Sequence, residues 1–337
     1  MPTPALPTPT FFVEALPPPT PVPTPDAPPA PTPTPNPLFN LSEGVFTVAW
    51  LSDTQHYAYK APEIFEAMTR FLRDEREKMN LLYVVHTGDF VDDRDDAAQW
   101  ENAMRAMESL EGIPYGVLGG NHDVGTSEQD FSVFSSCFGE KAMEKRPGSD
   151  AYYGGSYKDN RGHYDLVDIG ANRYVFAYMG YAPDSGAVAW LNRVFKEHRD
   201  RIGVLCVHDY FKTDMTYSDA GATLLKKVVK KNPNVYLVMC GHRYTVGHKS
   251  VEFDDDGDGA TDRRAYELIQ NYQAAGELGG SGYLQLLQFD DIKKELRLIS
   301  YSPYTDDRRY YDTPGTELEK YYVNPENEEY SFSYPWE

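Results

Sequence analysis

The sequence predicts a layered α/β domain built around a partly parallel sheet. Apolar runs of strand length alternate with segments that repeat apolar residues at helical spacing, and most of these runs end in polar residues. Alternating strands and helices are typical of βαβ units, in which helices cover the faces of a sheet. Open α/β sheets bind ligands beyond the carboxyl ends of their strands, so the polar residues at those ends are candidates for a functional site.

The amino-terminal half of the domain predicts a β-α-β-α-β unit. Apolar runs at residues 45–51, 81–85 and 115–118 are expected to be strands. Residues 62–79 and the segment after Asp93 carry apolar side chains at intervals of three and four, which indicates an amphipathic helix before each of the later strands.

The second half continues the alternation with less regular spacing. Residues 124–162 are rich in Gly, Ser and aromatic residues without a firm period, so a loop with a little helix is expected there, over the site. No pattern is readable after Tyr304. The further elements predicted are helices at 188–195 and 224–231 and strands at 163–169, 174–179, 202–207, 235–240, 265–270, 283–289 and 296–301.

Composition divides the chain into three segments. Residues 1–40 hold most of the 25 prolines in a Pro/Thr-rich tract, which is expected to be a disordered, extended linker. The globular domain is predicted at 41–312 and an acidic, tyrosine-rich tail at 313–337. Such linkers commonly join modules of secreted or wall-attached proteins, so we expect an extracellular or cell-surface location, although the first residues do not resemble a signal peptide.

Net charge and cysteine content exclude several classes of protein. The formal charge of −20 argues against binding to duplex nucleic acid or anionic lipid, and no apolar stretch is long enough to span a membrane. We expect a monomer. The three cysteines, Cys137, Cys206 and Cys240, show no CxxC spacing and predict neither a disulfide framework nor a zinc-thiolate site.

The segment at residues 81–93, LLYVVHTGDFVDD, carries the strongest indication of a metal site. An apolar strand stops at Gly88, which allows a tight turn, and Asp89 follows just beyond the strand's carboxyl end. Asp92 and Asp93 come within one further turn. Carboxylates packed together without a cation raise one another's pKa and cost stability, so we predict that Asp89 is a metal ligand.

Other strand ends supply further donors of the same kind. Carboxylate, amide and imidazole groups together suit hard and borderline cations such as Mn²⁺, Fe and Zn²⁺. Polar residues of this kind follow an apolar run at five predicted strand ends, which is hard to explain if they are only solvent-exposed surface residues. The residues at these ends are Asp53, Asp89, Asn121 with His122, His208, and His242.

These strand-end residues belong to five short motifs, which are Asp53-Thr54-Gln55, Gly88-Asp89-Phe90-Val91-Asp92, Gly120-Asn121-His122-Asp123, Val207-His208 and Gly241-His242-Arg243-Tyr244. With these motifs, over about residues 45–245, the chain resembles the calcineurin-like metallophosphoesterases, in a bacterial and often secreted branch. The resemblance implies a four-layer fold of two facing mixed β-sheets flanked by helices, with the site at the carboxyl ends of the strands.

The resemblance implies two divalent metal ions, Mn, Fe or Zn, bridged by Asp89. The first ion would be held by Asn121, His208 and His242. The second would be held by Asp53, by Gln55 and by the residue at Tyr244, two positions at which the family usually has histidine. We therefore expect one firm metal site and one weaker site. His56 is expected to point away from Gln55 on an extended loop.

The same resemblance implies hydrolysis of a phosphorylated small molecule or polymer, as a phosphomonoester or a phosphodiester. His122 would act as the general acid for the leaving oxygen, with Asp123 orienting its imidazole. Arg243 would contact a phosphate oxygen or be a surface charge. The alternative function is a degenerate, non-catalytic binding module of a cell-surface protein, suggested by Gln55 and Tyr244.

The remaining histidines and one acidic run leave two interpretations each. His86 could support the turn or fill the core, and His248 could replace the missing ligand or lie in a solvated loop; His163 and His198 are expected to be structural. The run DDDGDG places Asp254, Asp256 and Asp258 as in the opening of a calcium loop, but Ala265 stands where such loops carry Glu. It predicts either a calcium site or an acidic hairpin turn.

Overall fold

The computed structural model describes residues 38–39, 41–276, 278–313 and 324–336. The chain divides into residues 1–35 and a compact unit from Asn36 to Glu337, which contains all of the described residues. The predicted linker at 1–40 lies outside the described residues except for Leu38 and Phe39, so its state stays a prediction.

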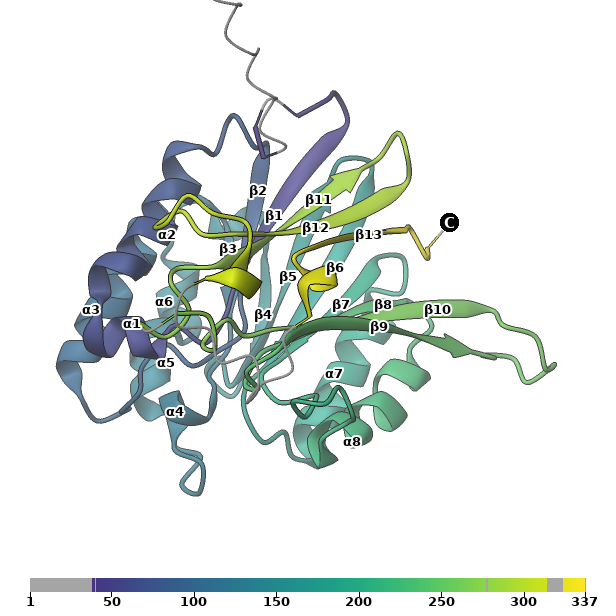
Figure 1. Cartoon of the computed structure of the whole chain (residues 1–337). Helices are drawn as coiled ribbons and strands as arrows, with labels where there is room; N and C mark the ends of the chain where they lie inside the picture. The colour runs from purple at the N-terminus through teal and green to yellow at the C-terminus, as the bar shows by residue number, and fades with distance from the viewer. Residues whose placement is uncertain (1–37, 40, 277, 314–323, 337) are drawn as a thin grey trace, which may run out of the picture. The chain divides into compact units, whose positions relative to one another are not determined.

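Two mixed β-sheets form the centre of this unit (Figure 1). The first sheet has the order β13-β12-β11-β1-β2-β3 and the second has the order β4-β5-β6-β7-β8-β10-β9. The strands of the first sheet are β1 Val45–Leu51, β2 Leu81–His86, β3 Tyr115–Val117, β11 Leu284–Asp290, β12 Glu295–Tyr301 and β13 Glu329–Ser333. Those of the second are β4 Tyr153–Tyr157, β5 Gly162–Ile169, β6 Asn172–Met179, β7 Ile202–Val207, β8 Val235–Cys240, β9 Val246–Phe253 and β10 Arg263–Gln270.

Each sheet has a parallel part that fixes where the strand ends meet. In the first sheet β2 runs parallel to both β1 and β3, and in the second the adjacent strands β6, β7, β8 and β10 run parallel to one another. The carboxyl ends of parallel strands lie at one edge of their sheet. The segments after β1, β2, β3, β7 and β8, which carry the predicted ligands, therefore emerge at these edges.

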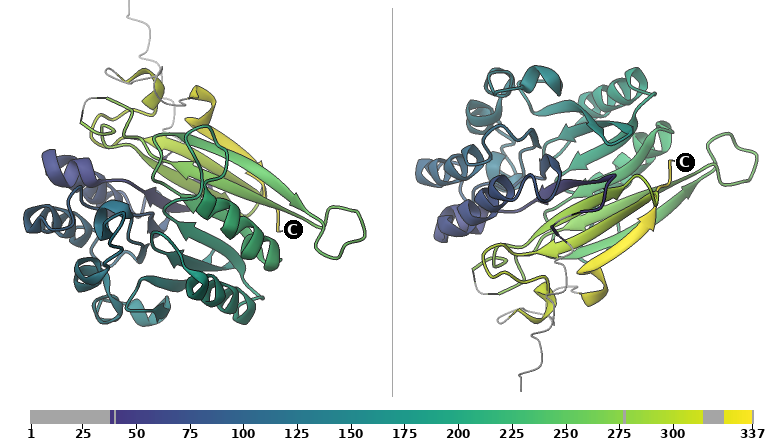
Figure 2. Two further views of the ribbon diagram at one scale, coloured as in Figure 1. Left: turned by 90° about the horizontal axis from the view of Figure 1, so that it is seen from below. Right: turned by 90° about the horizontal axis from the view of Figure 1, so that it is seen from above.

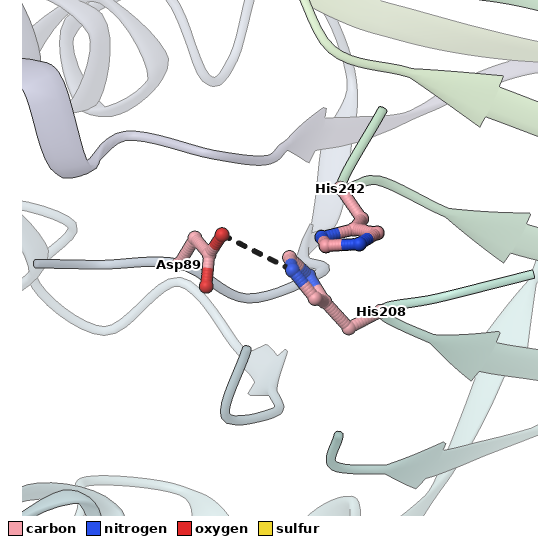
Figure 3. Close-up of side chains that lie close together, drawn as sticks. All are labelled: Asp89, His208 and His242. Carbon is pink, nitrogen blue, oxygen red and sulfur yellow. Dashed lines mark ion pairs between the residues drawn. The ribbon is translucent and has the colours of Figure 1, made fainter. Parts of the chain in front are cut away.

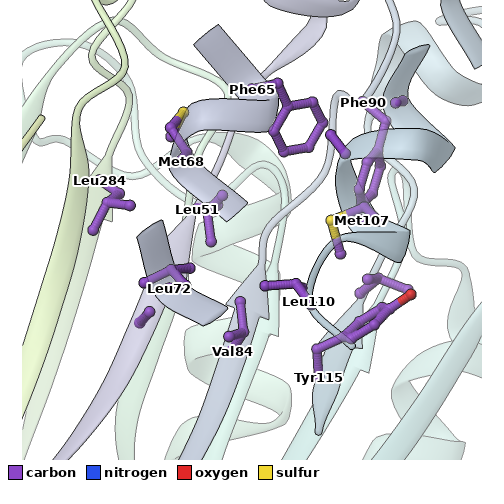
Figure 4. Packing of buried hydrophobic residues seen from close by; sticks show 14 of the residues in the cluster. Leu51, Phe65, Met68, Leu72, Val84, Phe90, Met107, Leu110, Tyr115 and Leu284 are labelled. Carbon is purple, nitrogen blue, oxygen red and sulfur yellow. The ribbon is translucent and has the colours of Figure 1, made fainter. Parts of the chain in front are cut away.

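Helices cover the outer faces of both sheets and complete four layers. Apolar side chains of α2 and α3, such as Phe65 and Met107, pack on Leu51 and Val84 of the first sheet (Figure 4). Trp50 and Phe176 belong to a separate core between the sheets. The third core lies beneath α7 and α8. The helices are α1 Gln55–Lys60, α2 Pro62–Asp74, α3 Ala97–Glu108, α4 Asn121–Val124, α5 Ser132–Phe138, α6 Glu140–Glu144, α7 Ser185–Glu197 and α8 Asp219–Lys227.

The predicted four-layer fold is confirmed, but several elements differ from the expectation. Helix α2 ends at Asp74 and not near residue 79, because its apolar repeat stops at Leu72. Strands β4, β9 and β13 were not predicted; β13 comes from the tail and pairs with β12 through residues such as Phe332. Helix α1 replaces the extended loop expected at Gln55 and His56.

Two sequence-based exclusions can be compared with the structure. None of the helices in the described part of the chain is long and apolar enough to cross a membrane. All three cysteines are free thiols, and Cys206 and Cys240 are fully buried in the cores. Cys206 and Cys240 therefore serve as small buried hydrophobic groups.

Candidate metal centre

The turn after β2 places Asp89 in an unusual backbone conformation. Gly88 has φ of 96° and Asp89 has φ of 57°, both in the left-handed region. A Cβ atom on Gly88 would lie 2.8 Å from the main-chain nitrogen of Gly120 and 2.9 Å from Nδ1 of His208. Only glycine fits there, and its small size lets the segments after β2, β3 and β7 meet around Asp89.

Three side chains converge at this point from strand ends far apart in the sequence. Single ligand atoms of Asp89, His208 and His242 all lie within 4.8 Å of one another, and Figure 3 shows the three side chains directed at a common region. Nε2 of His208 lies 3.1 Å from Oδ2 of Asp89 and 3.1 Å from Oδ1 of Asn121. The donors predicted for the first metal site are therefore grouped together.

The hydrogen bonds of His208 leave the correct nitrogen available for a metal ion. Nδ1 of His208 lies 2.8 Å from the main-chain oxygen of Thr87, which requires that Nδ1 donate its proton. Nε2 then faces Asp89 and Asn121. A second-layer carbonyl that fixes the imidazole tautomer in this way is the usual support of a metal-bound histidine.

The electrostatics of the site show a shortage of positive charge. Burial raises the pKa of Asp53 to about 7, and burial together with the Asp89 carboxylate raises the pKa of Asp123 to about 7. Burial would lower the pKa of His208, yet the Asp89 carboxylate raises it to about 10, so that a proton supplies the missing charge. A divalent cation among these donors would supply that charge instead, and the site fits one.

His242 and Asp53 are joined through the main chain. The N–H of His242 donates to both carboxylate oxygens of Asp53 at 3.0 Å, and the hydroxyl of Ser52 donates to Oδ2 at 2.5 Å. The imidazole of His242 is kept neutral, because burial and the neighbouring His208 lower its pKa to about 3. Its ring is thus suited to bind a cation.

Gln55 lies beside the Asp89 carboxylate, as predicted, although α1 rather than a loop presents it. Its amide nitrogen position is 3.4 Å from Oδ2 of Asp89. Exchanging the oxygen and nitrogen satisfies the amide better, with the nitrogen donating to the main-chain oxygen of Asp53 at 2.9 Å. The second metal site, at Asp53, Gln55 and the half-buried Tyr244, stays a prediction.

The surroundings of His122 differ from the prediction in one respect. Nδ1 of His122 lies 2.8 Å from the main-chain oxygen of Asp92 and 3.6 Å from its carboxylate. Asp123, which we expected to orient this imidazole, accepts instead from four main-chain N–H groups. These donors are Asp89 at 2.9 Å, Phe90 at 2.7 Å, Val91 at 3.1 Å and Gly120 at 2.8 Å.

Asp123 bonds to the main chain, and not to His122, because of its position in the fold. Asp123 is the third residue of the short helix α4, and its fully buried carboxylate faces the orphan N–H groups of two neighbouring turns. It holds the loop that carries Asp89 and therefore supports this predicted ligand rather than orienting His122. The main-chain N–H of His122 supports the Asp89 carboxylate directly, because it donates to Oδ1 of Asp89 at 2.9 Å.

The other histidines have structural surroundings. His86 is fully buried, lies 3.0 Å from the Thr54 hydroxyl and accepts from the N–H of Gly88, so it supports the turn. His163 bonds to the main chain of Val117 in the core, and His198 packs against Tyr164. His248 stacks on Tyr330 with ring centroids 3.9 Å apart and does not join the ligand cluster formed by the described residues.

The acidic run forms the tip of the β9–β10 hairpin, which projects from the body of the domain (Figure 2). Its closest group of carboxylates is Asp254, Asp256 and Asp262, all exposed, in place of the predicted Asp254, Asp256 and Asp258. Asp254 accepts from the N–H groups of Gly257 and Gly259. Oδ1 of Asp258 accepts from Ala260, so Asp258 closes the turn and lies outside the group.

Sequence reasoning missed two residues at the centre. Gln273, just after β10, donates from Nε2 to the main-chain oxygen of Asp53 at 3.1 Å and lies against Gln55. Tyr181, after β6, places its ring 6.2 Å from that of His208 and 6.1 Å from that of His242. Polar residues following a predicted strand would have indicated Gln273, whereas no sequence pattern distinguishes Tyr181.

Comparisons with known proteins agree with this geometry. Residues 46–244 match the family model described as calcineurin-like phosphoesterase. An uncharacterised protein of Bacillus subtilis, YvnB, is 44% identical over 274 residues, which are 81% of this chain and 21% of that protein. The chain thus spans about a fifth of the length of that relative.

Solved structures show likeness at the level of the fold. Yellow lupin purple acid phosphatase is 11% identical with a TM-score of 0.53, and the match covers 87% of this chain and 54% of that one. A 5'-nucleotidase precursor of Thermus thermophilus is 12% identical with a TM-score of 0.44, over 78% of this chain and 52% of that one.

Proposed function

The chain belongs to the calcineurin-like phosphoesterase family, and from this premise we propose that it is a metal-dependent hydrolase of phosphoester bonds. The enzyme class predicted from the sequence, a phosphoric ester hydrolase, is the class of this family. The observation that carries the proposal is the convergence of Asp89, His208 and His242 within 4.8 Å at the ends of three strands.

In this proposal, Asp89, Asn121, His208 and His242 hold a first divalent cation, and Asp53 with Gln55 contributes to a second. The cations would be Mn, Fe or Zn, and when bound they would activate a water molecule and offset the charge of the phosphoryl group. Asp89 is suited to bridge them, because the neighbouring histidines hold its pKa at about 2 despite burial and keep the carboxylate ionised.

We further propose that His122 is the general acid. Its Nδ1 is engaged by the main-chain oxygen of Asp92, so Nε2 is the atom that would hold the proton for the leaving oxygen. Burial lowers the pKa of His122, but Asp89 and Asp92 raise it above the ordinary value of histidine, which favours the protonated form that a general acid needs. Asp123 supports the reaction through the Asp89 loop.

Our proposals on the substrate, the location and the oligomeric state are less specific. The substrate would be a phosphorylated small molecule or polymer, as a monoester or a diester. We propose that the domain works outside the cell or on its surface, on the basis of the Pro/Thr-rich segment at residues 1–40. We also propose that it works as a monomer.

Hydrolysis of an aryl phosphodiester and an aryl phosphomonoester with added Mn²⁺ tests the proposal. Wild-type protein should hydrolyse at least one of them. Asp89→Asn should abolish turnover, because it removes the negative charge of the carboxylate that is proposed to bind both cations. Asp254→Asn is the matched control, because it removes an equal charge from the exposed hairpin. Turnover in Asp89→Asn equal to wild type would exclude this site as the catalyst.

One observation favours a second candidate, the non-catalytic binding module. Both oxygens of Asp53 accept a hydrogen bond from the N–H of His242. At the second site, Gln55 and Tyr244 stand at the two positions where the family usually has histidine. A metal-loaded, folded protein with no turnover on either aryl ester would support this module over the hydrolase.

A further inference from the structure

A groove lined by basic residues opens on the outer face of the second sheet, far from the metal centre. It lies between the end of α7 and the end of α8, which continues into the short η2 helix Val229–Lys231. Its volume is about 860 Å³, with Val188 and Phe195 among its apolar lining. We call this hollow the basic groove. Its cationic side chains are Lys196, Arg199, Lys227 and Lys231.

The charge of the groove is unusual for this chain, whose formal net charge is −20. All four cationic side chains are exposed, and within the described part of the chain none of them forms an ion pair. By contrast, the nearby Arg201 lies 2.8 Å from the carboxylate of Asp168. Four unpaired like charges around one hollow repel one another, and a bound anion would relieve that repulsion.

A purely structural explanation accounts for only part of this charge. Lys196 and Lys227 lie in the last turns of α7 and α8, where cations stabilise the helix dipole. Arg199 follows the end of α7, and Lys231 belongs to a helix of three residues with little dipole of its own. Dipole stabilisation therefore does not explain why these two residues face the same hollow.

The walls of the groove are joined by side-chain hydrogen bonds. Asn232 donates from Nδ2 to Oδ1 of Asn192 at 2.7 Å, which ties the end of η2 to α7. Asn192 donates in turn to the main-chain oxygen of Lys227 at 3.0 Å. The two helices are thus held at a set separation, so the groove does not need to form on binding. Small-molecule sites are usually concave, largely apolar and preformed in this way.

We propose that the basic groove is a binding site for small organic anions that carry a phosphate, sulfonate or carboxylate group on an apolar body. The cationic rim would hold the acidic group, and the apolar floor at Val188 and Phe195 would hold the body. The groove precedes β7 and β8, whereas His208 and His242 follow these strands. With strands of six residues and a rise of about 3.3 Å per residue, about 20 Å separates the two sites.

Titration with 8-anilinonaphthalene-1-sulfonate, followed by its fluorescence, tests this site in the full chain. The double variant Lys227→Gln/Lys231→Gln should bind the probe at least tenfold more weakly than wild type. The matched control is Lys226→Gln/Lys230→Gln, which removes the same charge from exposed residues of the same segment outside the groove. The control should bind within twofold of wild type. Equal affinities of the two double variants would overturn the proposal.

Two further measurements test the apolar part of the site. Val188→Asp places a carboxylate on the floor and should abolish probe binding, while circular dichroism and the thermal midpoint check that the variant folds. Inorganic phosphate alone should compete only weakly, because it has no apolar body. Competition by phosphate as strong as that of an aryl sulfonate would show that the floor contributes nothing, and would contradict the class of ligand proposed here.

Discussion

Two acidic clusters of this domain look alike in sequence and differ in the structure. Asp89 lies with His208 and His242 at buried strand ends, while Asp254, Asp256 and Asp262 lie at the exposed tip of the β9–β10 hairpin. At the buried centre the carboxylates of Asp53, Asp89 and Asp123 are almost completely removed from water. At the hairpin, water surrounds the carboxylates, and their oxygens accept main-chain N–H groups within the turn.

The difference explains why the buried cluster, and not the hairpin, is the predicted metal site. Burial removes water as a partner, so each charge at the centre must be balanced by another group or by a cation. An exposed carboxylate has no such requirement, because solvent screens its charge. A DDDGDG sequence therefore predicts a turn as well as a calcium site, whereas carboxylate and imidazole residues at several buried strand ends predict a metal centre.

Among the variants that should keep the metal, the largest effect is expected from removing the proposed general acid. His122→Ala should lower kcat by about 10²- to 10⁴-fold, the usual contribution of a positioned acid. Metal content should stay at the wild-type level, because the imidazole of His122 is not among the clustered ligands. Steady-state kinetics with metal analysis check both parts. A loss of metal along with activity would indicate that His122 is a metal ligand, and would contradict its assignment as the general acid.

The next prediction compares how much the loss of a buried and of an exposed carboxylate lowers the free energy of unfolding. Asp123→Ala should lower the free energy of unfolding by about 2–4 kcal/mol, since four buried N–H groups lose their acceptor. Asp254→Ala removes an acceptor of two N–H groups, but water can replace it, so the cost should stay below about 1 kcal/mol. Urea denaturation measures both. Similar costs for the two variants would contradict the role assigned to burial.

A third effect concerns pH. Burial lowers the pKa of His86 from 6.5 to about 3, so the imidazole stays neutral in the fold, while the unfolded chain takes up a proton below pH 6.5. Stability should therefore fall as pH drops from about 6.5 to about 3, with a slope of up to about 1.4 kcal/mol per pH unit from this residue. Unfolding of wild type and His86→Gln in EDTA checks this. An unchanged slope in the variant would exclude His86 as the source.

The smallest effect compares two cations. Saturating Mn²⁺ at a hundredfold excess over its dissociation constant should stabilise the fold by about 2.7 kcal/mol, a rise of a few degrees in Tm. Ca²⁺ at the same concentration should leave Tm unchanged, because the exposed hairpin carboxylates are already engaged in the turn. Thermal scans of the EDTA-treated protein provide the test. A rise with Ca²⁺ that Asp256→Asn abolishes would restore the calcium interpretation.

Much of the fold was predictable, because periodicity and strand ends are local signals. The strands at Val45–Leu51, Leu81–His86, Ile202–Val207 and Val235–Cys240 follow from continuous apolar runs. Strands β9 and β13 could not be predicted in this way, because both are edge strands with exposed residues such as Glu252 and Glu329. Pairing partners, not periodicity, make these segments strands.

The grouping of the centre was predictable, but not its supporting contacts. Asp89, Asn121, His208 and His242 could be expected to meet because they follow strand ends at the same edges. The role of Asp123 depends on how α4 faces the turn after β2, and that of Gln273 on where the chain runs after β10. Such contacts depend on loop geometry, which the residues alone do not determine.

Metal analysis of the purified protein, in atoms per chain, tests the buried centre most directly. We expect one to two Mn, Fe or Zn atoms per chain in wild type and in Asp254→Asn/Asp256→Asn, and far fewer in Asp89→Asn. A wild-type protein without transition metal after incubation with Mn²⁺ and Zn²⁺, or an Asp89→Asn variant that keeps the full amount, would contradict the account.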